Sequence, residues 1–332
     1  MRPELVVCPN SACGASGRIG VHSHKERRYK CHACKATFAE TVGTPLYGLK
    51  HPAWLVIVVL ALLAGGCPIP AIVFAFGLDE RTVADWHCKA GSHAKAIQEQ
   101  VVCQGAVDLG QVQGDELYVK TQRGKAWMAT AMCVFSRLFI WGAVARERDG
   151  ALVEQVVVKV RAAALIGRAI LWAVDGFAAW KSSVLGVFRD PQRTGKRGRP
   201  PLVVWADMHV VQVVKRYSGR QLSGIERRLA YGCNRCAEAI MQASQVSLGV
   251  INTAYIERLN ATFRTWMPSL TRRGRTPARE LAHVETAMFW MGAVYNFCRV
   301  HKTLQGTPAM AADLTDHVWS LDELLRYRLR RE

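Results

Sequence analysis

Three acidic residues, each in a different structural setting, constrain the fold of this chain most. Asp115 opens the strand expected in GDELYVK, Asp175 closes the one expected in AILWAVD, and Glu257 lies in the helical stretch TAYIERLNATFR. Carboxylates from separate elements can hold two hard cations about 3.5–4 Å apart, which polarise the attacking and leaving oxygens of a phosphodiester. The chain is therefore expected to bring a sheet and a helix together around Mg²⁺ or Mn²⁺.

The order of the expected elements meets this requirement. After residue 107 the pattern predicts three strands, a helix and a further strand, at 115–121, 126–135, 138–145, 151–164 and 168–174. This order is typical of an α/β protein of the RNase H-like class, a mixed sheet with flanking helices in which the first strand is central and the fourth lies beside it. Asp115 and Asp175 would then converge.

Glu257 would reach them from a later helix. Asn260 and Arg264 lie three and seven residues further on, so they share a helix face with Glu257. Asn260 is a candidate auxiliary residue of the site, and His301, further along the chain, is another.

Other acidic residues compete for two of the three places. Asp207 also ends an apolar strand, expected at 202–205, but Asp175 is favoured by its place on the fourth strand. Asp108 and Glu116 are weaker alternatives to Asp115. Glu116 is expected on the opposite face of the strand from Asp115, because successive strand residues alternate.

Four N-terminal cysteines predict a structural metal centre. Cys8 and Cys13 are separated by four residues, Cys31 and Cys34 by two, and 17 residues lie between the pairs. This spacing is typical of a zinc ribbon, whose four thiolates leave Zn²⁺ no open position for catalysis. The odd total of 11 cysteines and the lack of a signal-peptide pattern favour a reducing cytoplasm over a disulfide framework.

Three helices are expected after the cysteines, at 53–64, 69–76 and from Glu80 onward, where Asp79 is a good N-cap. This pattern indicates a helix-turn-helix whose third helix enters the major groove of DNA. The residues of that helix expected to contact DNA are Arg81, Thr82, Trp86 and Lys89.

Residues 54–77 carry no charge and would be long enough to cross a membrane. Gly65, Gly66, Pro68 and Pro70 interrupt the stretch, so we expect two short helices of the core and no membrane span.

Charge points to a polyanionic partner. Lys and Arg number 44 against 26 Asp and Glu, which gives a net charge of +18 and a pI near 9.7. A basic stretch beside the third acidic residue is expected to follow a DNA strand and contains Arg264, Arg272, Arg273 and Arg275.

Taken in order, these motifs resemble the IS1-like family of DDE transposases of insertion sequences. The resemblance covers nearly the whole chain and includes the zinc ribbon, the helix-turn-helix, GDELYVK, VDG at Asp175, IERLNATFR and VYNFCRVHKTL. It implies an enzyme that binds the terminal inverted repeats of its element, cleaves their 3′ ends and joins them to target DNA without a covalent enzyme intermediate. Asp115, Asp175 and Glu257 would be its triad. Synapsis implies a homodimer or larger assembly, associated with the nucleoid.

The predicted domains are a zinc ribbon at 1–48, a helix-turn-helix at 49–105, a catalytic domain at 106–305 and a C-terminal tail at 306–332. The catalytic domain is expected to contain a mostly helical insertion around 207–248. Two alternatives to a transposase stay open. One is a DNA-binding regulator with a decayed catalytic domain, and the other is a stand-alone nuclease of the same fold, which would cut DNA but never join it.

Overall fold

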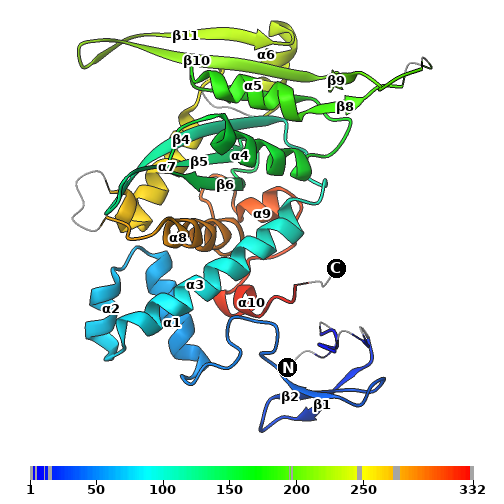
Figure 1. Cartoon of the computed structure of the whole chain (residues 1–332), viewed down its shortest axis with the longest axis vertical. Coiled ribbons are helices and arrows are strands. Elements are labelled where there is room, and N and C mark those ends of the chain that lie inside the picture. The colour runs from blue at the N-terminus through cyan, green and yellow to red at the C-terminus, as the bar shows by residue number, and fades with distance from the viewer. Residues whose placement is uncertain are drawn as a thin grey trace.

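The computed structural model describes residues 3, 6–10, 12–13, 17–193, 195, 197–244, 249–271 and 277–329. These residues form a mixed α/β protein extended along one axis (Figure 1). A six-stranded sheet with flanking helices occupies one end, helices fill the middle, and a three-stranded sheet of N-terminal residues lies at the other end.

The large sheet has the strand order β11-β10-β7-β4-β5-β6. Its strands are β4 (Gln111–Thr121), β5 (Gly124–Cys133), β6 (Phe139–Ala145), β7 (Ile170–Val174), β10 (Met208–Ser218) and β11 (Gln221–Tyr231). Strand β7 is parallel to both β4 and β10, and the remaining pairs are antiparallel. All five residues of β7 are buried, as expected of a parallel strand covered on both faces. The prediction that the first strand lies beside the fourth is confirmed, because these are β4 and β7.

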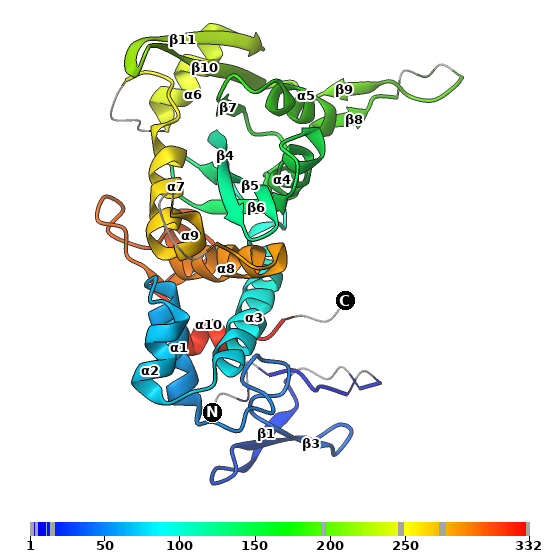
Figure 2. The ribbon, with the colours of Figure 1, turned by 60° about the vertical axis from the view of Figure 1, so that its left-hand side comes forward.

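Helices cover both faces of this sheet. Helices α4 (Gly150–Ala163) and α5 (Ala178–Val187) lie on one face, and α7 (Ala254–Trp266) lies on the other (Figure 2). Neighbouring residues of β4 show the alternation: a Cβ on Gly114 would lie 2.6 Å from the Trp180 ring of α5, whereas Gln113 bonds to the start of α7. Helix α6 (Asn234–Ala243) packs against β7 and β10.

The segment around 207–248 differs from the helical insertion that we expected. It forms the long β10–β11 hairpin, and α6 is its one described helix. The Val-Val-Gln-Val-Val run of β10 favours a strand, and Gly219, with φ of 62°, makes the turn. The strand expected at 202–205 is present as β9 (Leu202–Val204), but it pairs with β8 (Arg189–Pro191) outside the large sheet.

The middle of the molecule holds the three helices α1 (Ala53–Ala64), α2 (Ile69–Phe76) and α3 (Glu80–Ile97), which begin where the sequence predicted. Gly77, with φ of 63°, ends α2, and the Asp79 side chain caps α3 by accepting from the backbone nitrogens of Arg81 and Thr82. Within the described residues no helix combines the length and apolar character that crossing a membrane requires.

Helix α3 also contacts the layer below the large sheet. It packs along α8 (Leu281–Ala293), which lies against β6. The helices approach closely at Gly91, where a Cβ would lie 2.3 Å from the Thr286 carbonyl oxygen. Beyond α3 and α8 the chain continues as the π-helical turns Gln98–Val102 and Val294–Cys298, whose buried Gln98 and Asn296 both donate to the Phe139 carbonyl oxygen of β6.

The N-terminal sheet contains β1 (Ile19–Ser23), β2 (Arg28–Cys31) and β3 (Thr37–Ala39). The C-terminal segment that we expected to be a tail returns to it through α9 (Pro308–Ala311) and α10 (Leu321–Arg326). Arg326 forms an ion pair with Glu40 at 3.3 Å, and Arg328 donates to the carbonyl oxygens of Glu40 and Val42. The segment is therefore part of the packed structure.

Candidate active site

Three carboxylates meet at the centre of the large sheet. Gly114 of β4 pairs with Val174 of the parallel strand β7, so the next residues, Asp115 and Asp175, are neighbours. Together with Glu116 they offer oxygen atoms that all lie within 4.8 Å of one another. Asp115 lies inside β4, which begins four residues earlier than expected at the buried Gln111. This acidic cluster of Asp115, Glu116 and Asp175 could hold a divalent metal ion.

One arginine neutralises part of the acidic cluster. Arg148, just before α4, donates from Nη2 to Glu116 Oε2 at 3.0 Å and to Asp175 Oδ2 at 3.2 Å. Its guanidinium lies 4.4 Å from the centre of the Phe177 ring and 5.2 Å from that of Trp127. No sequence motif pointed to Arg148, because it lies in a connecting segment far from the acidic motifs.

Arg148 alone does not balance the negative charge of the three carboxylates in the acidic cluster. Burial, and then the charge of Asp175, raise the pKa of Asp115 to about 6 and that of Glu116 to about 7. Glu116 Oε1 is buried and has no hydrogen-bond partner within the described part of the chain. Oxygen ligands suit Mg²⁺ and Mn²⁺, so both the donor set and the unpartnered oxygen fit a divalent cation.

Helix α7 is positioned over Asp115 by buried amides. Gln113 Nε2 donates to the Asn252 carbonyl oxygen at 2.6 Å, and its Oε1 accepts from the backbone nitrogen of Ile256 at 2.9 Å. One turn further on, Asn260 Nδ2 donates to Asp115 Oδ2 at 2.8 Å, and Asn260 Oδ1 accepts from Thr130 Oγ1 at 3.0 Å. The structure thus brings Asn260 to Asp115. Gln113 and Thr130 were missed, although Gln113 precedes Asp115 by two residues and so shares its face of the strand.

Glu257 lies near the acidic cluster without joining it. Its Oε1 accepts from Thr253 Oγ1 at 2.6 Å and is paired with Lys215 of β10. Its charge contributes to the raised pKa of Asp115. The sequence predicted Asp115, Asp175 and Glu257 as a triad, and the structure groups the first two with Glu116.

Two of the competing acids, Asp207 and Asp108, lie outside the acidic cluster. The Asp207 carbonyl oxygen accepts from the backbone nitrogen of Ile170 at 2.9 Å, which places Asp207 at the start of β7, whereas Asp175 follows its end. Asp108 pairs with Arg168 at 3.3 Å. Of the candidates for the middle acid, the structure brings Asp175 to Asp115.

The residues of α3 predicted to bind DNA are not equally available. Arg81 and Lys89 are exposed and Thr82 is half-buried, but Trp86 is only 3% exposed and packs edge-on against His51. The expectation for Trp86 was wrong, because it shares the buried face of α3 with Val83 and Ala90, three and four residues away.

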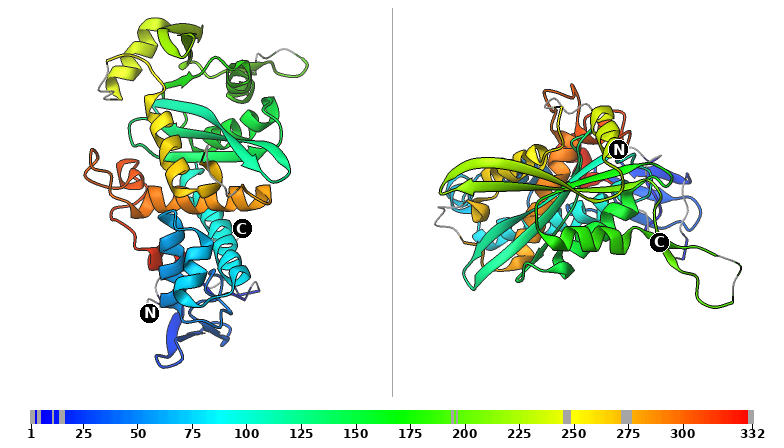
Figure 3. Two further views of the ribbon diagram at one scale, coloured as in Figure 1. Left: turned by 90° about the vertical axis from the view of Figure 1, so that its left-hand side faces the viewer. Right: turned by 90° about the horizontal axis from the view of Figure 1, so that it is seen from above.

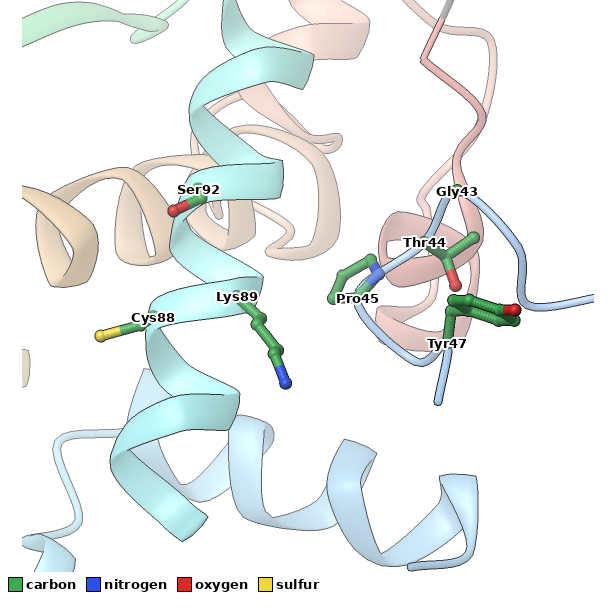
Figure 4. Close-up of a pocket in the computed structure, with 7 residues that line it drawn as sticks. All are labelled: Gly43, Thr44, Pro45, Tyr47, Cys88, Lys89 and Ser92. Atoms are coloured by element: carbon green, nitrogen blue, oxygen red, sulfur yellow. The ribbon is translucent and has the colours of Figure 1, made fainter. Parts of the chain in front are cut away.

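Lys89 lies beside a surface pocket between α3 and residues 43–47 (Figure 4). The pocket measures about 470 Å³, and Tyr47 and Cys88 also line it. Lys89 forms an exposed ion pair with Asp85 at 2.7 Å.

Arg264 lines a second pocket, of about 380 Å³, together with Glu116 and Trp127. This places Arg264 beside the acidic cluster. Arg272, Arg273 and Arg275 lie outside the described residues.

His301 Nδ1 contacts Thr303 Oγ1 at 2.9 Å, and burial together with two nearby arginines lowers the pKa of His301. The contacts of His301 therefore do not tie it to the acidic cluster.

The four N-terminal cysteines come together as predicted. Their sulfurs all lie within 4.8 Å of one another, with 3.5 Å between those of Cys8 and Cys34 and 3.8 Å between those of Cys13 and Cys31. Four thiolates at about 2.3 Å from a tetrahedral Zn²⁺ would lie about 3.8 Å apart. A backbone hydrogen bond from Ala36 is the main cause that lowers the pKa of Cys34 to about 7, whereas burial is the main cause that raises the pKa of Cys8 to about 12. This four-cysteine cluster therefore fits a structural metal ion.

No protein-family model matches the chain, and no curated protein matches it. The function is therefore inferred from the chemistry of the acidic cluster and the four-cysteine cluster, the charge of the chain and the order of its motifs.

Proposed function

We propose that this chain is a DNA transposase, a polynucleotidyl transferase that cleaves the ends of a DNA element and joins them to target DNA. The observation that carries the proposal is the meeting of Asp115 and Asp175 on adjacent parallel strands, with Glu116 beside them. The strand order β6-β5-β4-β7-β10 and the helices on both faces support an RNase H-like catalytic fold.

In this proposal Asp115, Asp175 and Glu116 hold Mg²⁺ or Mn²⁺, with Glu257 on α7 as a further ligand. The bound metal supplies polarisation of the phosphodiester oxygens and activation of water or a 3′-hydroxyl. Asn260 fixes the orientation of Asp115 by donating to its Oδ2, which leaves Oδ1 on the side of the Glu116 backbone nitrogen.

Two cations near the carboxylates would act in DNA binding. Arg148 is about one-third exposed and Lys215 is similarly exposed, so both can turn toward a phosphate when a metal ion takes their place at the carboxylates. The planar fork of Arg148 suits two phosphate oxygens.

Recognition of the terminal repeats is assigned to the other end of the molecule. The four-cysteine cluster would hold Zn²⁺ and stabilise a sheet too small to have an extensive core. Helices α2 and α3 would act as a helix-turn-helix, with Arg81 and Lys89 exposed toward DNA. The net charge of +18 supports this partner, and pairing of two DNA ends would require at least a homodimer.

The proposal is tested with end-labelled DNA from the borders of the gene's own locus and a supercoiled target. Wild type is expected to produce nicked ends and joined products with Mg²⁺ or Mn²⁺ and none with a chelator. Asp115→Asn should retain DNA binding and lose both products, because the metal loses a charged ligand while the surface stays basic. Equal products from Asp115→Asn would reject the assignment, and cutting without joining would indicate a nuclease.

One observation favours a second candidate, a DNA-binding regulator without catalysis. Glu257 is paired with Lys215, so one acidic residue of the expected triad is already neutralised within the protein. A regulator would bind the same DNA ends and yield no metal-dependent product, including from Lys215→Gln, which removes the ion pair of Glu257. Products from Lys215→Gln but not from wild type would show a site held inactive by this ion pair.

A further inference from the structure

Strands β8 and β9 form an arm that leaves the body of the protein. Arg189 pairs with Val204 and Pro191 with Leu202, and the backbone nitrogen of Gln192 donates to the Pro201 carbonyl oxygen at 2.9 Å. The view from above shows the arm extending beyond the sheet and its helices (Figure 3). Every described residue from 189 to 199 is exposed, so this segment adds no core to the fold.

The base of the arm is firmly anchored. Trp205 Nε1 donates to Asp190 Oδ2 at 2.7 Å, and the indole packs edge-on against Phe188 at 5.1 Å between ring centres. Arg161 of α4 pairs with Asp190, lies 5.5 Å from the centre of the Trp205 ring and donates to the Val187 carbonyl oxygen at 3.0 Å. These contacts hold the base of the arm against α4 and Phe188.

The far end of the arm is basic and unpaired. The sequence from 191 to 206 has four basic residues and no acidic one. Within the described part of the chain, Arg193, Arg197 and Arg199 have no ion pair and no side-chain hydrogen bond. By contrast, the exposed Arg216 and Arg228 of the β10–β11 hairpin both form ion pairs with Glu226. The arm thus concentrates positive charge that nothing in the described fold uses.

The arm lies far from the acidic cluster. Strand β9 ends at Val204, and Asp207 pairs with the start of β7 through the backbone nitrogen of Ile170. Asp175 follows the other end of β7, and five strand residues span about 16 Å. A stretch of polyanion bound to the arm would therefore lie apart from the stretch whose phosphate would reach Asp115 and Asp175.

We propose that this arm is a second DNA-binding surface, whose arginines bind the phosphate backbone of duplex DNA away from the stretch at the acidic cluster. Residues 191–204 contain no aromatic side chain, so the arm offers charge without a platform for stacking unpaired bases, which favours a duplex over a single strand. The inference rests on the proposed function for the identity of the polyanion, and on the anchored base of the arm and its unpaired arginines for the surface.

The test replaces Arg193, Arg197 and Arg199 together by Gln, with the corresponding Lys triple as the matched control that keeps the charge. Binding to a long random duplex is measured over a range of salt concentrations. For the Gln triple we expect a shallower negative slope of log K against log salt. Its magnitude should decrease by about 0.9 for each phosphate that the arm no longer binds, up to about 2.7 in all. The Lys triple should keep nearly the wild-type slope, and both should unfold at the wild-type temperature.

A wild-type slope for the Gln triple would overturn the proposal. So would a loss of binding to single-stranded DNA by the Gln triple that equals its loss of binding to the duplex. These outcomes are separate from the proposed function. If the arm changes the salt slope while wild type never cleaves DNA, the arm stands and the transposase proposal fails. If wild type cleaves and joins DNA while the Gln triple keeps the wild-type slope, the arm fails and the transposase proposal stands.

Discussion

Asp115 and Glu116 are adjacent residues of β4 that contact opposite layers of the protein. Asp115 accepts from Asn260 of α7, whereas Glu116 is paired with Arg148 near α4. Asp175 completes the acidic cluster because it follows the last residue of the neighbouring strand. The sequence placed Glu116 on the opposite face from Asp115, which these contacts confirm, but that alternation did not reveal that Glu116 also lies close to Asp175.

The raised pKa of Glu116 predicts a pH effect on stability. Its pKa is about 7 in the folded protein against an ordinary value of 4.5, so the folded state holds a proton that the unfolded chain releases between these values. This group's contribution to stability therefore falls as pH rises through that window. In metal-free buffer, thermal unfolding of wild type should lose more stability between about pH 5 and about pH 8 than that of Glu116→Gln. Parallel curves for the two proteins would contradict the raised pKa.

At the scale of elements, the sequence predicted best where local signals are strong. Pro52 precedes α1 and Gly65 follows it, so α1 begins and ends as expected, and Asp79 caps α3, which begins as expected. The β10–β11 hairpin was missed because its exposed half, Lys215 to Arg228, is polar on both faces and lacks a clear period of two. Arg148 and Lys215 could not be assigned to the site from sequence, because only tertiary pairing brings them to the acids.

The contact between α3 and α8 depends on a residue without a side chain. A Cβ at Gly91 would lie 2.3 Å from the Thr286 carbonyl oxygen, and a backbone atom cannot move away without shifting the helix. We expect Gly91→Ala to destabilise the protein by about 1–3 kcal/mol. The matched control is Gly186→Ala in α5, where the nearest atom is the end of the Arg189 side chain at 4.0 Å. That change should be neutral or stabilise by up to about 1 kcal/mol, and denaturant unfolding of both variants measures the difference. Equal effects of the two changes would show that α3 and α8 are not closely packed at this point.

At the scale of the whole molecule, the four-cysteine cluster and the acidic cluster are linked by continuous structure. Helix α3 begins in the three-helix unit and packs against α8 beneath the sheet, and Arg326 and Arg328 join the C-terminal segment to Glu40 beside β3. The proposed recognition of DNA at one end and its cleavage at the other would thus be held in a fixed spatial relation.

We propose that Asp175, which lies beside Asp115 where β4 and β7 run in parallel, holds the metal for DNA cleavage. The most direct measurement compares Asp175→Asn with Asp207→Asn in the Mg²⁺-dependent cleavage and joining assay, because both residues lie beside β7 but at opposite ends. We predict that Asp175→Asn binds the DNA ends and yields no product, whereas Asp207→Asn cleaves and joins like wild type. Loss of product from Asp207→Asn with retained activity of Asp175→Asn would contradict the account.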